Sequence, residues 1–181
     1  MKILIVILFA LAFLVILLTT GYAYYGGFTT VTFKEAEQGG EAMVYEEMTG
    51  DYSQTPKVAD KIYHALLNDE KIETTKGIDI CYDDPKVVEK SKLRSEVGCI
   101  VEGLDSTVIA GLSEKYNVKT LPVSNCMVTE FPFKGKLSIF VAMMKVYPAF
   151  RKYFEQHGVS NTPVVEIYDV LNKKIVYRKE V

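Results

Sequence analysis

The sequence predicts an α+β domain that follows an N-terminal transmembrane helix. Three observations support this fold class. Residues 3–28 carry no charged side chain. After them, segments whose apolar side chains alternate with a period of two are interspersed with segments whose apolar side chains recur every three or four residues, as in strands and helices respectively. The order of these segments is ββαββ, a linking helix and then ββαββ, so two halves of equal element type follow the anchor.

The apolar segment begins with the uninterrupted run ILIVILFALAFLVILL, Ile3 to Leu18, and adds three tyrosines before Gly26-Gly27. Its length suits a bilayer, which requires about 20 residues of helix, and tyrosines favour the interface. The alternative is a cleavable signal peptide with Lys2 before the apolar core and a small-x-small site at Gly21-Tyr22-Ala23. The run is longer than a usual signal core, which favours an anchor. We therefore expect residues 3–25 to contact the membrane, residues 1–27 to form the anchor and a short hinge, and residues 28–181 to form one domain.

The first half of the domain begins with two expected strands, Phe28–Phe33 and Ala42–Met48, joined by a turn at Gln38-Gly39-Gly40 as a hairpin. A helix should open at Thr55-Pro56, because proline is tolerated in the first helical turn. Its apolar stripe is Val58, Ile62, Ala65 and Leu66, and two strands follow it, Gly77–Tyr82 and Leu93–Val101.

A short linking helix, capped by Ser106 and running to Tyr116, should connect the halves. The second half then has strands at Val118–Leu121 and Met127–Phe133, a long helix, and strands at Val164–Tyr168 and Lys174–Arg178. The long helix should end at His157-Gly158, because glycine readily adopts the left-handed conformation found after helices. Pro148, inside this helix, should kink or split it.

One face of the long helix is expected to be buried. Its members recur at spacings of three and four: Phe140, Met144, Tyr147, Phe150 and Phe154. The expected solvent-facing side carries Ser138, Lys145, Lys152 and Gln156. After Pro163 the period changes to two, which places Glu166 and Tyr168 on the same strand face.

The pieces FPF, LSI, VYPAF and P-x-x-EIY, with the upstream stretch DICYDDPKVVEKSKLRSEVGCIVE, resemble the gyrase-inhibitor-like (AraC effector-binding-like) small-molecule-binding domain. The resemblance covers most of the chain. It implies that the two halves are related by an approximate two-fold and that a ligand cleft lies between them. It also implies an acidic residue in that cleft, and Glu166 is the residue in the matching EIY motif.

Glu166 is the sharpest candidate for a ligand-binding residue, because apolar neighbours would desolvate its carboxylate and strengthen its attraction for a cation. An ordinary solvent-facing strand position is the alternative. Tyr168 should point the same way. The aromatic residues expected to wall the cleft for a planar or cationic ligand are Tyr82, Phe131, Phe133 and Tyr147, each of which could instead be a core residue.

Composition excludes several other classes of function. The formal net charge is −2 and no basic block appears, so nucleic acid is not an expected partner. Cys81, Cys99 and Cys126 lack metal-ligand spacing and are expected to be small buried hydrophobes. Asp83-Asp84-Pro85 reads as a turn, since two carboxylates are too few for a hard cation. We expect no metal, no cofactor and no catalytic residue.

Three functions follow from these observations. The leading one is a membrane-anchored module that binds a small cationic or aromatic molecule. The second is a protein-interaction adaptor, although the membrane-anchored family member that the chain resembles has a long disordered acidic tail, whereas this sequence stops at Val181, after its last expected strand. The third is a hydrolase with Glu166 as general base, for which no second catalytic group is evident. The resemblance, the unpaired cysteines and the lack of an Asn-x-Ser/Thr sequon place the domain on the cytoplasmic side.

Overall fold

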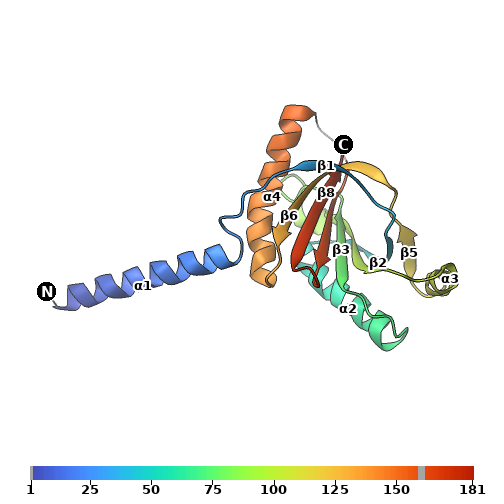
Figure 1. Cartoon of the computed structure of the whole chain (residues 1–181), viewed down its shortest axis with the longest axis horizontal. Coiled ribbons are helices and arrows are strands. Elements are labelled where there is room, and N and C mark those ends of the chain that lie inside the picture. The colour runs from blue at the N-terminus through green and yellow to red at the C-terminus, as the bar shows by residue number, and fades with distance from the viewer. Residues whose placement is uncertain (1, 159–161) are drawn as a thin grey trace.

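The computed structural model describes residues 2–158 and 162–181. A long helix, α1 (Lys2–Tyr24), projects away from a domain built on a strongly curved antiparallel sheet (Figure 1). In the described part of the chain this sheet has eight strands: β1 (Lys34–Gln38), β2 (Ala42–Thr49), β3 (Lys76–Cys81), β4 (Arg94–Val101), β5 (Asn117–Thr120), β6 (Ser124–Pro132), β7 (Val164–Asp169) and β8 (Lys174–Glu180). The helices of the domain are α2 (Thr55–Asn68), α3 (Ser106–Ser113) and α4 (Lys136–His157), with short 3-10 turns at Tyr52–Gln54 and Lys90–Lys92. The expected ββαββ, linking helix, ββαββ order is confirmed.

The strands lie in the order β1-β6-β8-β7-β3-β4-β2-β5. Strands at equal distances on either side of the central β7–β3 contact differ by four in chain order. The pairs are β7 and β3, β8 and β4, β6 and β2, and β1 and β5. This is the order that a two-fold axis between β3 and β7 would produce, although the two-fold relation of the halves stays a prediction. The outermost strands are exchanged, because β1 pairs with β6 of the second half and β5 pairs with β2 of the first.

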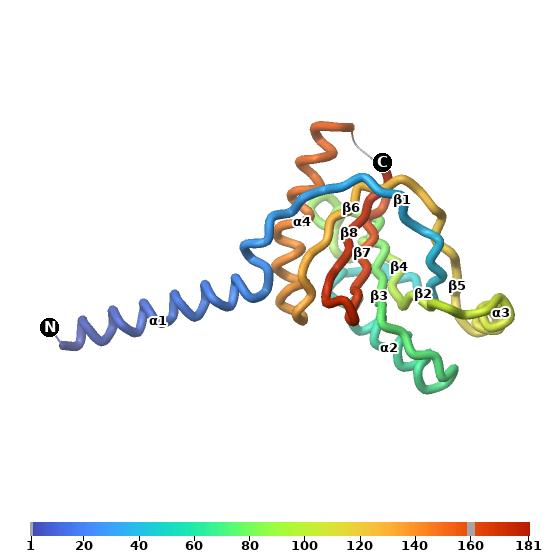
Figure 2. The backbone as a smooth tube through the Cα atoms, in the orientation of Figure 1, coloured from blue at the N-terminus to red at the C-terminus, as the bar shows by residue number. Residues whose placement is uncertain are grey.

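The expected hairpin between Phe28–Phe33 and Ala42–Met48 is wrong, because the strand that precedes β2 pairs with β6, and β2 pairs with β4 and β5. Gly39 and Gly40 have φ values of 126° and 86°, a region that favours glycine, and they lie in the link that carries the chain from β1 to β2 without pairing the two strands. The expected strand at Phe28–Phe33 is also wrong, because the first strand begins only at Lys34. Residues 28–33 do alternate between exposed and half-buried positions, and Figure 2 shows this segment crossing α4 before it reaches β1. The alternation therefore reflects packing on a helix: the ring of Phe33 lies 4.7 Å from that of Phe150.

Both long helices of the domain cover the same face of the sheet. Ile62 and Leu66 of α2 pack with Val44 and Cys99, and α4 packs with a second cluster on β6 and β8 that contains Phe131 and Tyr177. Sheet register joins these clusters, since Val44, Cys99, Gly77, Tyr168, Ile175 and Phe131 are successive cross-strand partners. All three cysteines are free and buried, as expected.

The buried side of α4 differs from the expected one. Phe150 and Phe154 are buried, but Phe140 and Met144 are 62% and 63% exposed and Ser138 is fully buried. The reason is that the first half of α4 is apolar on two sides, so helical spacing alone could not select the packed side. The helix continues through Pro148 without interruption, so it is not split, and it ends at His157 before Gly158 as expected. The linking helix is capped by Asp105, which accepts hydrogen bonds from the amides of Thr107 and Val108, and not by Ser106.

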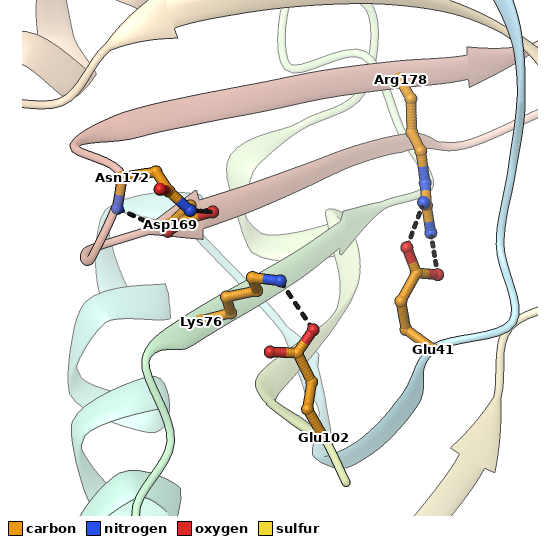
Figure 3. Close-up of polar contacts among 6 residues, drawn as sticks. All are labelled: Glu41, Lys76, Glu102, Asp169, Asn172 and Arg178. Carbon is orange, nitrogen blue, oxygen red and sulfur yellow. Dashed lines mark hydrogen bonds and ion pairs between the residues drawn. The ribbon is translucent and has the colours of Figure 1, made fainter.

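Several polar contacts join strand ends and neighbouring loops of the sheet (Figure 3). Arg178 on β8 is 3% exposed and forms a two-pronged ion pair with Glu41 at 2.8 and 3.0 Å. Lys76 pairs with Glu102, and Asp169 accepts two hydrogen bonds from Asn172 in the β7–β8 turn. Glu41 directly precedes β2, so its ion pair with Arg178 holds the segment between β1 and β2 close to β8.

Candidate ligand-binding site

A row of polar side chains crosses the centre of the sheet on the face that α2 and α4 cover. Thr129, Tyr177, Glu166 and Asp79 are successive cross-strand partners on β6, β8, β7 and β3. All four are buried, with exposures of 5% or less. Buried polar groups normally need partners to offset the loss of hydration, so the contacts of this row decide what it can do.

Glu166 receives a hydrogen bond on each carboxylate oxygen. Tyr147 on α4 donates to Oε1, and Tyr168, two residues along β7, donates to Oε2 at 2.6 Å. Burial raises the pKa of Glu166, and the two phenol hydrogen bonds counteract part of that rise. Burial thus disfavours the ionised form of Glu166, and the two neutral donors favour it.

Asp79 lies directly opposite Glu166 on the neighbouring strand. Burial, together with the nearby charge of Glu166, raises the pKa of Asp79 to about 7, while a hydrogen bond with Thr55 at the start of α2 acts in the opposite direction. Two carboxyl groups side by side in an apolar setting disfavour double ionisation. A positive group beside the two carboxyl groups would relieve this repulsion.

Tyr177 completes the row and was missed in the sequence analysis. It is fully buried, and its hydroxyl has no hydrogen-bond partner among the described residues. Burial is the main cause that raises its pKa, followed by the charge of Glu166. The alternation within Lys174–Arg178 could have placed Tyr177 on the helix-covered face, but only the strand register puts it opposite Glu166.

A surface pocket of about 470 Å³ lies between α4 and the loop that follows β3. Its α4 wall includes the aromatic residues Tyr147, Phe150 and Phe154, and its loop wall includes Tyr82. Arg151 and Asp84 join the two walls through an ion pair of 2.9 Å. The pocket is thus aromatic on one side and carries charges of both signs at its edge. Tyr147 thus lines the pocket and also contacts the buried carboxylate of Glu166.

The six residues predicted from the sequence fall into two groups. Glu166, Tyr168 and Tyr147 form one hydrogen-bonded cluster, and Tyr82 lines the same pocket as Tyr147. Phe131 is 1% exposed in the core beneath α4, and Phe133 is partly buried with its ring 6.0 Å from that of Tyr168. Neither phenylalanine lines the pocket.

Comparison with known proteins assigns this chain to a protein family. The GyrI-like small molecule binding domain matches residues 37–177. The chain belongs to that family. Human Testis-expressed protein 264 is 32% identical over 99 residues, which amounts to 51% of this chain and 32% of the human protein, and its mouse homolog is 30% identical over the same length. The match therefore spans about a third of the length of these relatives.

Two solved structures share the fold of this GyrI-like chain. The C-terminal domain of EcmrR superposes with a TM-score of 0.59 at 11% identity, covering 84% of this chain and all of that domain. SAV2435, solved with bound tetraphenylphosphonium, superposes with a TM-score of 0.52 at 16% identity, covering 83% of this chain and 92% of that protein. At these identities the likeness concerns the fold.

Proposed function

We propose that this GyrI-like domain is held at a membrane by α1 and binds a small aromatic cation between α4 and the β3–β4 loop. The observation that carries the proposal is a buried carboxylate, Glu166, which lies next to an aromatic pocket and whose hydrogen-bond donors among the described residues are two phenol hydroxyls. Two further features support it: the ring-lined wall suits a flat cationic ligand, and SAV2435, which has the same fold, was solved with tetraphenylphosphonium.

The ligand would reach Glu166 through Tyr147. A rotation of this side chain would break its hydrogen bond to the carboxylate and would connect the pocket to the buried row. The cation would then replace the phenol as the partner of Glu166, and Asp79 opposite it would ionise more easily. The unpartnered hydroxyl of Tyr177 would become available to a polar atom of the ligand.

Membrane attachment and sidedness belong to the same proposal. α1 is long and apolar enough to cross a bilayer, and no residue of it is buried against the domain. We place the domain on the cytoplasmic side, where free cysteines persist. The domain would in this way face the cytoplasm while sampling lipophilic cations near the bilayer.

The test is a titration of the full chain in detergent or nanodiscs with tetraphenylphosphonium and with uncharged triphenylphosphine oxide. Glu166→Gln should weaken binding of the cation by about 2–5 kcal/mol, the scale for removing one partner of a buried charge pair, and should affect the neutral compound far less. Glu130→Gln, an exposed carboxylate on β6 that pairs with Lys174, is the matched control and should change neither affinity.

Two outcomes contradict the proposal. Equal losses for the two compounds in Glu166→Gln would assign a structural role to this residue. Binding of neither compound by the unmodified chain would argue against the pocket itself and would favour the adaptor function instead.

A further inference from the structure

The first half of α4 carries an exposed apolar side. Leu137, Phe140 and Met144, spaced at i, i+3 and i+7, are 56%, 62% and 63% exposed, and Met143 beside them is 39% exposed. Large apolar side chains gathered on one exposed helix face indicate a contact surface. Phe150 and Phe154, further along the same helix, are buried, so the exposed side chains are additional to those that form the core.

The charged residues in and just before α4, from residue 131 to residue 154, are all positive. Between Glu130 and Glu155 the sequence has no acidic residue, yet it contains Lys134, Lys136, Lys145, Arg151 and Lys152. This local excess of positive charge occurs in a chain whose formal net charge is −2. Helices that combine an apolar face with flanking lysines and arginines typically lie in the interface of bilayers with anionic lipids.

The end of α1 fixes α4 at the depth of such an interface. Tyr22 and Tyr24 lie at the end of α1, and the ring of Phe28, just beyond the helix, is 5.3 Å from that of Tyr22. Aromatic residues gather at the level of the lipid headgroups. Lys145 in the middle of α4 donates a hydrogen bond of 2.5 Å to the carbonyl of Gly27.

A second contact ties the start of α4 to the same level. The ammonium group of Lys134 lies 4.4 Å from the centre of the Tyr24 ring, a cation–π geometry. Figure 1 shows α4 running crosswise to α1 on the side of the sheet from which α1 departs. With α1 spanning the bilayer, α4 would lie along the membrane surface.

We infer that the exposed side of α4, formed by Leu137, Phe140, Met143 and Met144, inserts into the interface of an anionic membrane next to the anchor. This inference rests on the anchoring part of the proposed function and is independent of ligand binding. Because Phe150 and Phe154 of the same helix wall the pocket, the bilayer surface would lie close to the pocket, and lipophilic ligands would have a short path to it.

Spin labels on the full chain, reconstituted in vesicles of phosphatidylcholine with and without phosphatidylserine, test this arrangement. A cysteine is introduced singly at Phe140, Met144, Leu11 in α1 or Val108 on α3, which lies far from α1 in Figure 1. The native cysteines are buried and should react little. Each label is scored by its collision rates with oxygen, which concentrates in lipid, and with a water-soluble nickel chelate.

We expect the oxygen-to-nickel ratio at Phe140→Cys and Met144→Cys to exceed that at Val108→Cys severalfold, and to rise further with phosphatidylserine. Nickel accessibility at both α4 positions equal to that at Val108→Cys, with Leu11→Cys in lipid, would overturn the inference while leaving the anchor intact. Protection of the α4 labels from both reagents would also overturn it, because protein and not lipid would then cover this side. A water-exposed label at Leu11→Cys would refute the anchor and the inference together.

Discussion

Tyr147 on α4 donates a hydrogen bond to Glu166 on β7, and its ring is at the same time a wall of the pocket. This one side chain therefore links the buried carboxylate to the wall of the pocket. Tyr168 supplies the second hydrogen bond from the same strand as Glu166, so it cannot move as independently as Tyr147 can.

Tyr147→Phe should destabilise the folded chain by about 1–3 kcal/mol at neutral pH, the cost of removing one of the two hydrogen-bond donors to a buried carboxylate and leaving its Oε1 unsatisfied. The loss should shrink in acid, because a protonated Glu166 needs the donor less. Denaturant unfolding of Tyr147→Phe, Glu166→Gln and the double variant measures the coupling between the two residues.

Tyr153→Phe is the control on the same helix, since the Tyr153 ring packs against Phe33 and Phe154, and it should cost less. Additive effects of Tyr147→Phe and Glu166→Gln would mean that the hydrogen bond contributes nothing to stability.

Asp79 should give the domain a stability that decreases as pH rises. Its pKa is about 7 in the folded chain against an ordinary value of 3.8, so between these values the folded state binds more protons than the unfolded state. The contribution of Asp79 to the free energy of unfolding is therefore fully present below about pH 4 and is lost as the pH rises to about 7. Asp79→Asn should therefore stabilise the domain at pH 8 by up to about 4 kcal/mol, at about 1.4 kcal/mol per unit of pKa shift, and should have little effect near pH 4.

Asp169 provides a control of opposite sign. Burial raises the pKa of its carboxyl, but hydrogen bonds from Asn172 outweigh this effect and lower it. Asp169→Asn should thus destabilise the domain at pH 8, with an effect that fades in acid. Chemical unfolding at several pH values measures both variants, and a pH-independent effect of Asp79→Asn would show that Asp79 is not perturbed as described.

The order of the elements could be predicted from the sequence because most elements carry their own local signal, although the first strand was expected at Phe28–Phe33 and lies at Lys34–Gln38. Proline in the first turn of α2 and glycine after α4 mark helix ends, and alternation marks most strands. The choice of partner for each strand has no such local signal. Nothing local in Lys34–Gln38 indicates that it pairs with β6, almost a hundred residues away, in place of the adjacent β2.

The site shows the same division between local and long-range information. The position of Glu166 and Tyr168 on one strand face follows from the two-residue period, and their hydrogen bond agrees with it. The placement of Asp79 and Tyr177 beside Glu166 depends on the register of three strands, which the sequence does not express locally. The misassigned side of α4 has a related cause, since Phe140 and Phe150 look equivalent by spacing but only one of them meets the sheet.

That difference predicts unequal costs of truncating two phenylalanines on one helix. Phe150 is 3% exposed and its ring lies parallel to that of Phe154, 6.0 Å away. Phe150→Ala should destabilise the domain by about 3–5 kcal/mol, as truncation of buried aromatic residues does. Phe140→Ala in detergent should change stability little, and Lys152→Ala likewise. Similar denaturation midpoints for Phe150→Ala and Phe140→Ala would show that the buried side of α4 is wrongly assigned.

α1 should retain the chain in membranes. Its 23 residues include Lys2 at the start and no other charged side chain, and none of them is buried in the domain. The helix therefore exposes an apolar surface on every side, which favours a bilayer over water. The full chain should sediment with membranes and remain there after carbonate extraction. A chain beginning at Phe28 should be released, since α1 contributes nothing to the core clusters, although Tyr25 packs against one of them.

The competing interpretation makes a distinct prediction: a signal peptide would be removed, and a secreted product beginning near Tyr24 would be found by N-terminal sequencing. Recovery of that product would refute the anchor, whereas an intact N-terminus in the membrane fraction would support it.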